Sequence, residues 1–120
     1  MKQLLSNIDD LKDLVVEVMV DQKAEDVVVM DICDITVIAD YFIVCTARND
    51  AQMRAISKEI TDKLNEEGYD IKRKEGEAES GWILMDWKDI IVHIFKESER
   101  EFYDLERVWG DATIVRVTGE

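Results

Sequence analysis

His93 is the one histidine of this 120-residue chain and its best candidate for acid–base chemistry. It lies in the apolar run Asp89–Phe95, which has the length of a β-strand. A general base needs a nucleophile and an orienting acid nearby. Asp86 and Glu99 are acids within reach, but no serine or cysteine stands in the context of an activated nucleophile. The pattern therefore favours a structural histidine that is hydrogen-bonded to a neighbouring acid.

Two close carboxylate pairs occur at the ends of strand-like runs, Asp31 with Asp34 and Asp86 with Asp89. Metal-dependent phosphoryl transfer needs carboxylates that converge on a cation, and donors that hold the phosphates. No glycine-rich phosphate-binding loop is present in the sequence, and aspartate is common beside turns for conformational reasons. We therefore predict no catalytic residue, no metal site and no cofactor. The alternative is a nucleotidyltransferase-like enzyme that uses these pairs with Mg²⁺.

The cysteines and the charge balance limit the compartment and the partners. Cys33 and Cys45 form no CxxC motif, and a single histidine cannot complete a zinc site with them, so buried free thiols in a reducing cytoplasm are expected. The 28 acidic and 15 basic residues give a net charge of −13. This charge repels nucleic-acid phosphates and anionic membranes and favours a basic partner. With no signal peptide or membrane-spanning run apparent, we expect a cytoplasmic protein that binds neither membranes nor specific nucleic-acid sequences.

Apolar periodicity predicts one α/β domain over residues 1–120, with a mixed β-sheet and helices packed on it. Two β-branched runs are apolar at nearly every position, so we expect central strands covered on both faces. Asn49 with Gln52 predicts the start of the second helix, and Gly68 its end. The expected elements are, in chain order, a helix at Leu4–Lys23, strands at Asp26–Ile32 and Asp40–Thr46, a helix over 49–68, a polar edge strand at Tyr69–Lys74, an acidic loop at Glu75–Ser80, a hairpin of Trp82–Asp86 and Asp89–Phe95, a third helix and a strand at Thr113–Val117.

The third helix combines an apolar stripe with a polar face. Ser98 and Glu101 form an S-x-x-E capping box that is expected to open the helix. Tyrosine and arginine framed by acids are typical interface residues, because they bring large contact area and directional hydrogen bonds. A solvated face with ordinary pairing of side chains four residues apart explains the same pattern. The expected stripe is Phe102, Leu105, Val108 and Trp109, and the polar face carries Glu99, Arg100, Tyr103, Glu106 and Arg107.

Longer stretches of sequence resemble the ribosomal silencing factor family, also called RsfS or Iojap-like. The similarity covers about residues 5–117, which is almost the whole chain. Its most specific part is D-x-x-V-H-x-F followed by R-x-F-Y-x-L-E-x-x-W. The four segments that carry the resemblance are Ala39–Thr46, Gly81–Asp86, Asp89–Phe95 and Arg100–Trp109.

The resemblance implies a nucleotidyltransferase-like α/β fold without the catalytic residues, and a binding function. Family members bind ribosomal protein uL14 of the large ribosomal subunit, block its joining to the small subunit and repress translation when nutrients are limiting, and they often form homodimers. The family commonly has glycine in the hairpin where this chain has Lys88, and a positive φ at a lysine would cost about 1 kcal/mol. The partner-binding residues implied by position are Trp82, Asp86, Asp89, His93, Glu99, Arg100 and Tyr103.

Overall fold

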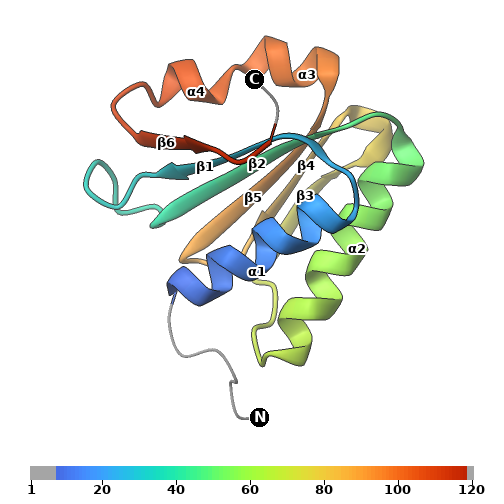
Figure 1. The fold of residues 1–120 in the computed structure, drawn as a ribbon, viewed down its shortest axis with the longest axis horizontal. Coiled ribbons are helices and arrows are strands. Elements are labelled where there is room, and N and C mark those ends of the chain that lie inside the picture. Colours follow the sequence, from blue (N-terminus) through green and yellow to red (C-terminus); the bar gives the residue numbers. More distant parts are fainter. Residues whose placement is uncertain (1–7, 119–120) are drawn as a thin grey trace.

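The computed structural model describes residues 8–118, and over these residues the chain forms a six-stranded mixed sheet with helices on both faces (Figure 1). The strand order is β3-β4-β5-β2-β1-β6, in which β2 and β5 pair in parallel and the other neighbours are antiparallel. The mixed α/β class is therefore confirmed, and the nucleotidyltransferase-like detail stays a prediction. The elements are α1 (Ile8–Asp21), β1 (Glu25–Asp31), β2 (Tyr41–Ala47), α2 (Asp50–Glu66), β3 (Arg73–Glu77), the 3₁₀ turn η1 (Ala78–Ser80), β4 (Trp82–Asp86), β5 (Ile90–Lys96), α3 (Glu97–Tyr103), α4 (Leu105–Val108) and β6 (Thr113–Arg116).

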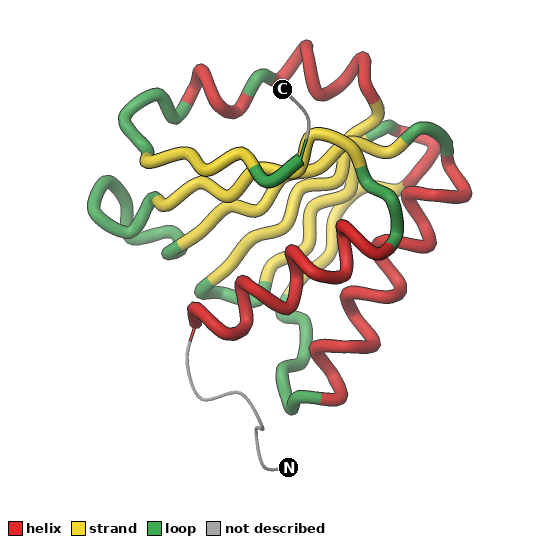
Figure 2. Tube along the Cα trace, in the orientation of Figure 1, coloured by secondary structure: helices red, strands yellow, loops and turns green. Residues whose placement is uncertain are grey.

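The sheet separates two apolar cores. Helices α1 and α2 cover one face and enclose the larger core, whereas α3 and α4 lie over the other face and the smaller core (Figure 2). Strands β1 and β2 contribute side chains to both cores, which explains their almost unbroken apolar runs. The expectation of strands covered on both faces is confirmed. The expectation of buried thiols is confirmed for Cys45 and is wrong for Cys33, which is exposed. No helix within residues 8–118 is long and apolar enough to cross a membrane.

The first two helices follow the sequence signals closely. The predicted start of α1 before Ile8 lies outside the described residues, and its end at Asp21 falls two residues before Lys23, which has a positive φ of 65°. At α2 the Asn49 side chain accepts a hydrogen bond from the Gln52 backbone N–H at 2.8 Å, which confirms the predicted N-cap. Gly68 follows the end of α2 with a φ of 89°, as expected for a helix-terminating glycine.

The edge strand was placed wrongly by the sequence pattern. Strand β3 occupies Arg73–Glu77, most of which was predicted as loop, and all five of its residues are exposed. Because no side chain of β3 is buried, only its pairing with β4 marks it as a strand. Gly76 within it has a φ of 79°, and a Cβ there would overlap the backbone oxygen of Trp82. Tyr69 and Ile71, predicted to lie in the strand, instead lie before it and pack against the larger core.

The predicted capping box of the third helix is also wrong. Helix α3 begins at Glu97 directly after β5, and its N-cap residue Lys96 makes no side-chain capping bond. The Ser98 hydroxyl donates instead to the Glu99 carboxylate at 2.7 Å. Since β5 runs straight into the helix, the start of α3 is set by the strand and not by a cap.

The expected single helix is broken at Asp104, which has a left-handed φ of 43°. The break separates α3 from α4, so the apolar spacing no longer falls on one face. Leu105 and Trp109 pack against the smaller core as predicted. Phe102 and Val108 do not, because they are 80% and 69% exposed.

The hairpin between β4 and β5 turns through Lys88. The Trp87 N–H donates to the Ile90 carbonyl at 3.0 Å, and the Asp89 N–H donates to the Trp87 carbonyl at 3.0 Å. Lys88 has a φ of 78°, and its N–H donates to the Asp86 carboxylate at 2.6 Å. The turn therefore places a lysine in the left-handed region, which settles the turn geometry that the sequence left open.

Replacing Lys88 by glycine is expected to stabilise the protein. Glycine adopts a φ of 78° without a Cβ clash, so Lys88→Gly should raise the free energy of unfolding by about 1 kcal/mol. Lys88→Ala is the matched control, because it removes the charge and keeps the clash. Urea unfolding of the three proteins measures the difference, and equal stabilities of the glycine and alanine variants would contradict the expectation.

Candidate protein-docking site

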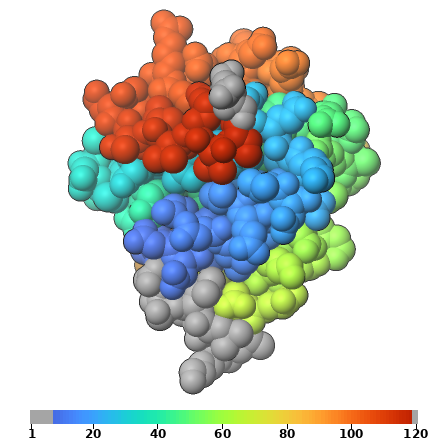
Figure 3. Space-filling view, viewed as in Figure 1, coloured from blue at the N-terminus to red at the C-terminus, as the bar shows by residue number. Residues whose placement is uncertain are grey.

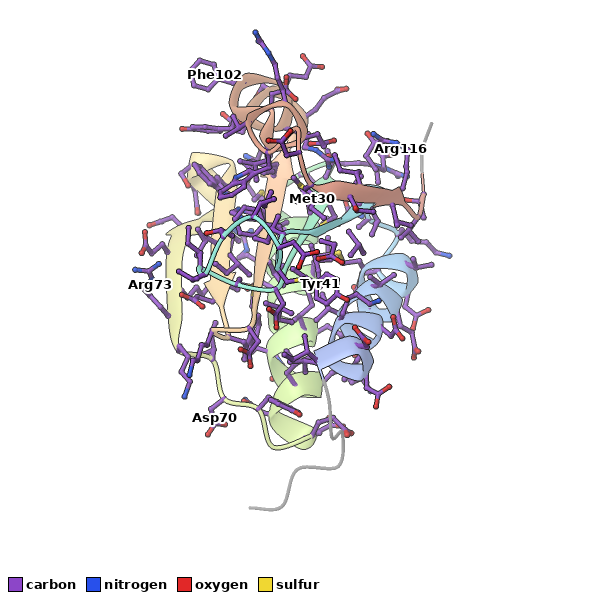
Figure 4. All side chains as sticks on the ribbon, turned by 90° about the vertical axis from the view of Figure 1, so that its left-hand side faces the viewer. Met30, Tyr41, Asp70, Arg73, Phe102 and Arg116 are labelled. Atoms are coloured by element: carbon purple, nitrogen blue, oxygen red, sulfur yellow. The ribbon has the colours of Figure 1, made fainter. Side chains whose placement is uncertain are left out.

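Two aromatic side chains meet where β4 begins and α3 ends. The ring centroids of Trp82 and Tyr103 lie 4.3 Å apart, and the Tyr103 side chain is 39% exposed. Phe102, whose ring lies 5.0 Å from that of Tyr103, projects from α3 away from the sheet (Figure 4). Beneath them Phe95 of β5 stacks on Trp82 at 5.1 Å. We call the exposed or half-buried residues Trp82, Phe102 and Tyr103 the aromatic patch.

His93 lies directly beneath the aromatic patch and holds Trp82 in place. Its Nδ1 accepts a hydrogen bond from the Trp82 indole N–H at 3.1 Å. The predicted acidic partner of His93 is therefore wrong, because tryptophan takes that position. Nδ1 accepts, so the neutral ring carries its proton on Nε2, which is buried and has no hydrogen-bond partner among residues 8–118. At 3% exposure His93 does not reach the surface, and it acts on any partner through Trp82.

The burial of His93 makes stability depend on pH. Desolvation lowers the pKa of His93 to about 3, whereas an unfolded histidine keeps a pKa near 6.5. Between these values the unfolded state binds a proton that the native state excludes. Stability is therefore lost as pH falls below about 6.5, by about 1.4 kcal/mol per pH unit from this group.

Two measurements test this linkage. The ring-proton NMR resonance of this single histidine should stay that of a neutral imidazole from about pH 7 down to about pH 5. Urea unfolding over the same range should show a smaller loss of stability in His93→Gln, which cannot titrate, than in the unmodified protein. A resonance that titrates near pH 6.5 in the folded protein would show that His93 is hydrated.

Glu99 of α3 lies at the border of the aromatic patch. Gly81, directly before Trp82, has a φ of 83°, and a Cβ at that position would overlap the Glu99 side chain. Glu99 therefore lies against the start of β4, one helical turn before Tyr103. Three of the residues that the resemblance implied, Trp82, Glu99 and Tyr103, are thus brought together. They form an aromatic surface with a carboxylate at its border.

Arg100 points into the protein instead of toward a partner. Its side chain is 10% exposed, and its guanidinium donates to the Asp26 carbonyl and the Thr46 hydroxyl, each at 2.9 Å. It also pairs with the Glu106 carboxylate at 3.0 Å. The pairing of side chains four residues apart that the sequence also allowed would have joined Arg100 to Asp104. Burial opposes ionisation of Glu106, but Arg100 outweighs it and the pKa of that carboxyl is lowered. Arg100 therefore ties α3 and α4 to β1 and β2.

Loss of the Arg100 contacts should destabilise the fold. Arg100→Met leaves the half-buried Glu106 carboxylate and two acceptors without their donor, at an expected cost of about 2 kcal/mol in free energy of unfolding. Arg48→Met is the matched control, because its ion pair with Glu25 is exposed and is worth about 0.5 kcal/mol. Urea unfolding gives both values. Equal losses would show that the buried contacts add nothing to an exposed ion pair.

Asp86 and Asp89 lie apart from the aromatic patch. They flank the hairpin at the far end of β4 and β5, about 13 Å along the strand from Trp82. Asp86 also approaches Arg73 at 3.7 Å, and the Asp89 carbonyl accepts from the Asp40 N–H at 2.8 Å. Within residues 8–118 no three acidic, cysteine or histidine side chains are grouped so as to hold a metal ion.

A groove beside the aromatic patch was not predicted from the sequence. It has a volume of about 260 Å³ and lies between β3, β4 and the end of α3. The sequence gives no signal for this groove, because β3 has no apolar side chain and most of it was predicted as loop. The groove is lined by Glu75, Gly76, Ser80, Trp82, Leu84 and Tyr103.

The fold and the site together define a mixed α/β domain that presents an aromatic patch and an adjoining groove. A family model described as ribosomal silencing factor during starvation matches residues 6–120. Ribosomal silencing factor RsfS of Bacillus subtilis is 43% identical over 94 residues, covering 78% of this chain and 80% of that protein. RsfS of Halalkalibacterium halodurans is 40% identical over 110 residues, with 92% and 94% covered. The chain belongs to the ribosomal silencing factor family, which confirms the resemblance.

More distant relatives and solved structures agree with this assignment. The chloroplastic protein Iojap of Zea mays is 33% identical over 95 residues, which cover 79% of this chain and 41% of that longer protein. A crystal structure from Chromobacterium violaceum superposes with a TM-score of 0.84 at 30% identity, covering 95% of both chains. One from Bacillus halodurans gives 0.78 at 35% identity, covering 91% of this chain and 99% of that one.

Proposed function

We propose that this protein is a ribosomal silencing factor that docks on protein uL14 of the large subunit through its aromatic patch. By occupying that surface it blocks joining of the small subunit and represses translation when nutrients are limiting. It acts by binding and not by catalysis, in the cytoplasm, and it is a homodimer when free. Family membership supports the ribosomal role. The observation that carries the docking site is the Trp82–Tyr103 contact, which places large aromatic area at the surface.

The chemistry of the patch suits a basic protein surface. Trp and Tyr are the residues that most often dominate binding energy when they are central to an interface. Helix α3 places Glu99 at the border of the patch and also carries Glu97 and Glu101, and the whole chain has a charge of −13. Acidic borders around an aromatic centre speed encounter with a basic partner and repel RNA phosphates. The partner expected from these features is a basic ribosomal protein rather than ribosomal RNA.

Cosedimentation with isolated subunits tests the proposal. The protein should pellet with large subunits and not with small ones, and binding should weaken with added salt, because border charges act through screened fields. Pelleting with both subunits alike, or with protein-free ribosomal RNA, would contradict it.

Variants of the patch locate the contact. Trp82→Ala and Tyr103→Ala should each weaken large-subunit binding by about 2 kcal/mol, as central anchors do. Val115→Ala is the control, because Val115 is 56% exposed on β6, which forms the opposite edge of the sheet from β3. Strand β6 appears in red on the face shown in Figure 3. Melting temperatures of the same variants separate lost contact from lost fold: stable variants that no longer bind establish the patch, and binding lost only in step with stability refutes it.

A further inference from the structure

The groove beside the aromatic patch has two kinds of wall. Trp82, Leu84 and Tyr103 supply aromatic and apolar surface, and Glu75 is the one carboxylate in its lining. Glu75 and Leu84 are opposite each other in the β3–β4 register, so they share one side of the sheet. A side chain that enters the groove therefore meets ring faces first and a negative charge at the β3 rim.

Trp82 offers this groove no polar group. The only polar atom of its side chain, the indole nitrogen, already donates to the buried Nδ1 of His93, and its backbone carbonyl accepts from the Ser80 hydroxyl at 3.3 Å. What remains for a ligand is the π surface of the ring, which attracts cations electrostatically. The Ser80 hydroxyl is also engaged, because it donates to the Glu77 carbonyl at 2.7 Å. Recognition in the groove therefore depends on ring faces and on the Glu75 charge.

Glu75 already holds a guanidinium of this chain. Its carboxylate pairs with Arg73 at 3.0 Å, and the two side chains are 56% and 59% exposed. Such an exposed pair is worth little and exchanges readily. Arg73 also lies 3.7 Å from the Asp86 carboxylate, so it keeps a partner when it leaves Glu75. Arg73 lies along the edge strand in Figure 4, at the margin of the sheet where a partner would approach.

We propose that this groove receives an arginine side chain of the docking partner. Its guanidinium stacks on the rings of Trp82 and Tyr103 and replaces Arg73 on Glu75, while its methylene groups cover Leu84. Arginine fits better than lysine, because the guanidinium is planar, weakly hydrated and able to stack while it forms paired hydrogen bonds. The assignment of this arginine to a ribosomal protein rests on the proposed function, whereas the specificity of the groove does not.

A peptide titration tests the groove by itself. The full chain, labelled with ¹⁵N, is titrated with the amidated tripeptides Gly-Arg-Gly, Gly-Lys-Gly and Gly-Leu-Gly. The arginine peptide should shift the resonances of Gly76, Ser80 and the Trp82 indole in a saturable way. The lysine peptide should bind several-fold more weakly, and the leucine peptide should leave these resonances unchanged. Equal responses to all three peptides, or a stronger response to leucine or lysine, would overturn the proposal.

Charge-removing variants assign the role of Glu75. Glu75→Gln should weaken binding of the arginine peptide about tenfold, as loss of a charge-assisted pair does. Glu79→Gln is the matched control, because Glu79 pairs with Arg54 at 3.6 Å and lies outside the groove lining. Equal effects of the two variants would refute the specificity of Glu75.

The same variants in the pelleting assay separate this inference from the proposed function. If the unmodified protein pellets with large subunits, Glu75→Gln should weaken that binding and Glu79→Gln should not. An unmodified protein that fails to pellet refutes the ribosomal role, and the peptide titration still decides the groove. Normal pelleting by Glu75→Gln together with no response to the arginine peptide refutes the groove and leaves the ribosomal role intact.

Discussion

The hydrogen bond between the Trp82 indole and the buried His93 is the contact on which the proposed docking surface depends. A half-exposed tryptophan at the start of a strand would otherwise sample several rotamers, and a partner would have to order it at the cost of side-chain entropy. Here the indole is held from below: its N–H donates to His93, Phe95 stacks against it, and the ring of Tyr103 lies beside it at 4.3 Å. The aromatic patch is thus ordered in the free protein.

This arrangement costs stability within the core. The Nε2 atom of His93 is buried with no hydrogen-bond partner, and an unsatisfied buried polar group costs about 1–3 kcal/mol. A leucine at this position would avoid that cost but would leave the indole N–H without its acceptor. A histidine thus stands where an apolar residue would cost less, at a site where it orients Trp82, and such a local loss of stability is expected where it supports the proposed docking surface.

Arg100 links that surface to the rest of the sheet. Helix α3 has no buried residue of its own, so apolar packing alone holds it weakly. The Arg100 guanidinium donates to the Asp26 carbonyl of β1, to the Thr46 hydroxyl of β2 and to the Glu106 carboxylate beyond the helix break. These contacts fix where α3 ends and therefore where Tyr103 meets Trp82. A residue that resembles an interface arginine in sequence thus acts by positioning the aromatic one three residues later.

The sequence predicted the elements with local signals correctly and missed the features that depend on non-local contacts. Runs whose burial dictates their pattern, such as β1, β2 and the Asn49-capped α2, were predicted to within a few residues, because apolar spacing and capping are local signals. Strand β3 was misplaced, since pairing with β4 is a non-local signal that leaves no trace in a polar sequence. Spacing also could not show the break at Asp104 or the inward turn of Arg100.

The burial of His93 opposes a role for this residue as a general base. A general base must reach its substrate and must be able to accept a proton near neutral pH. His93 is 3% exposed, its Nδ1 lone pair is taken by Trp82, and desolvation lowers its pKa to about 3. All three features oppose proton transfer, and all three favour a neutral ring that accepts one fixed hydrogen bond. His93, the residue best suited by type to catalysis, therefore serves to fix the orientation of Trp82, a side chain of the proposed docking surface.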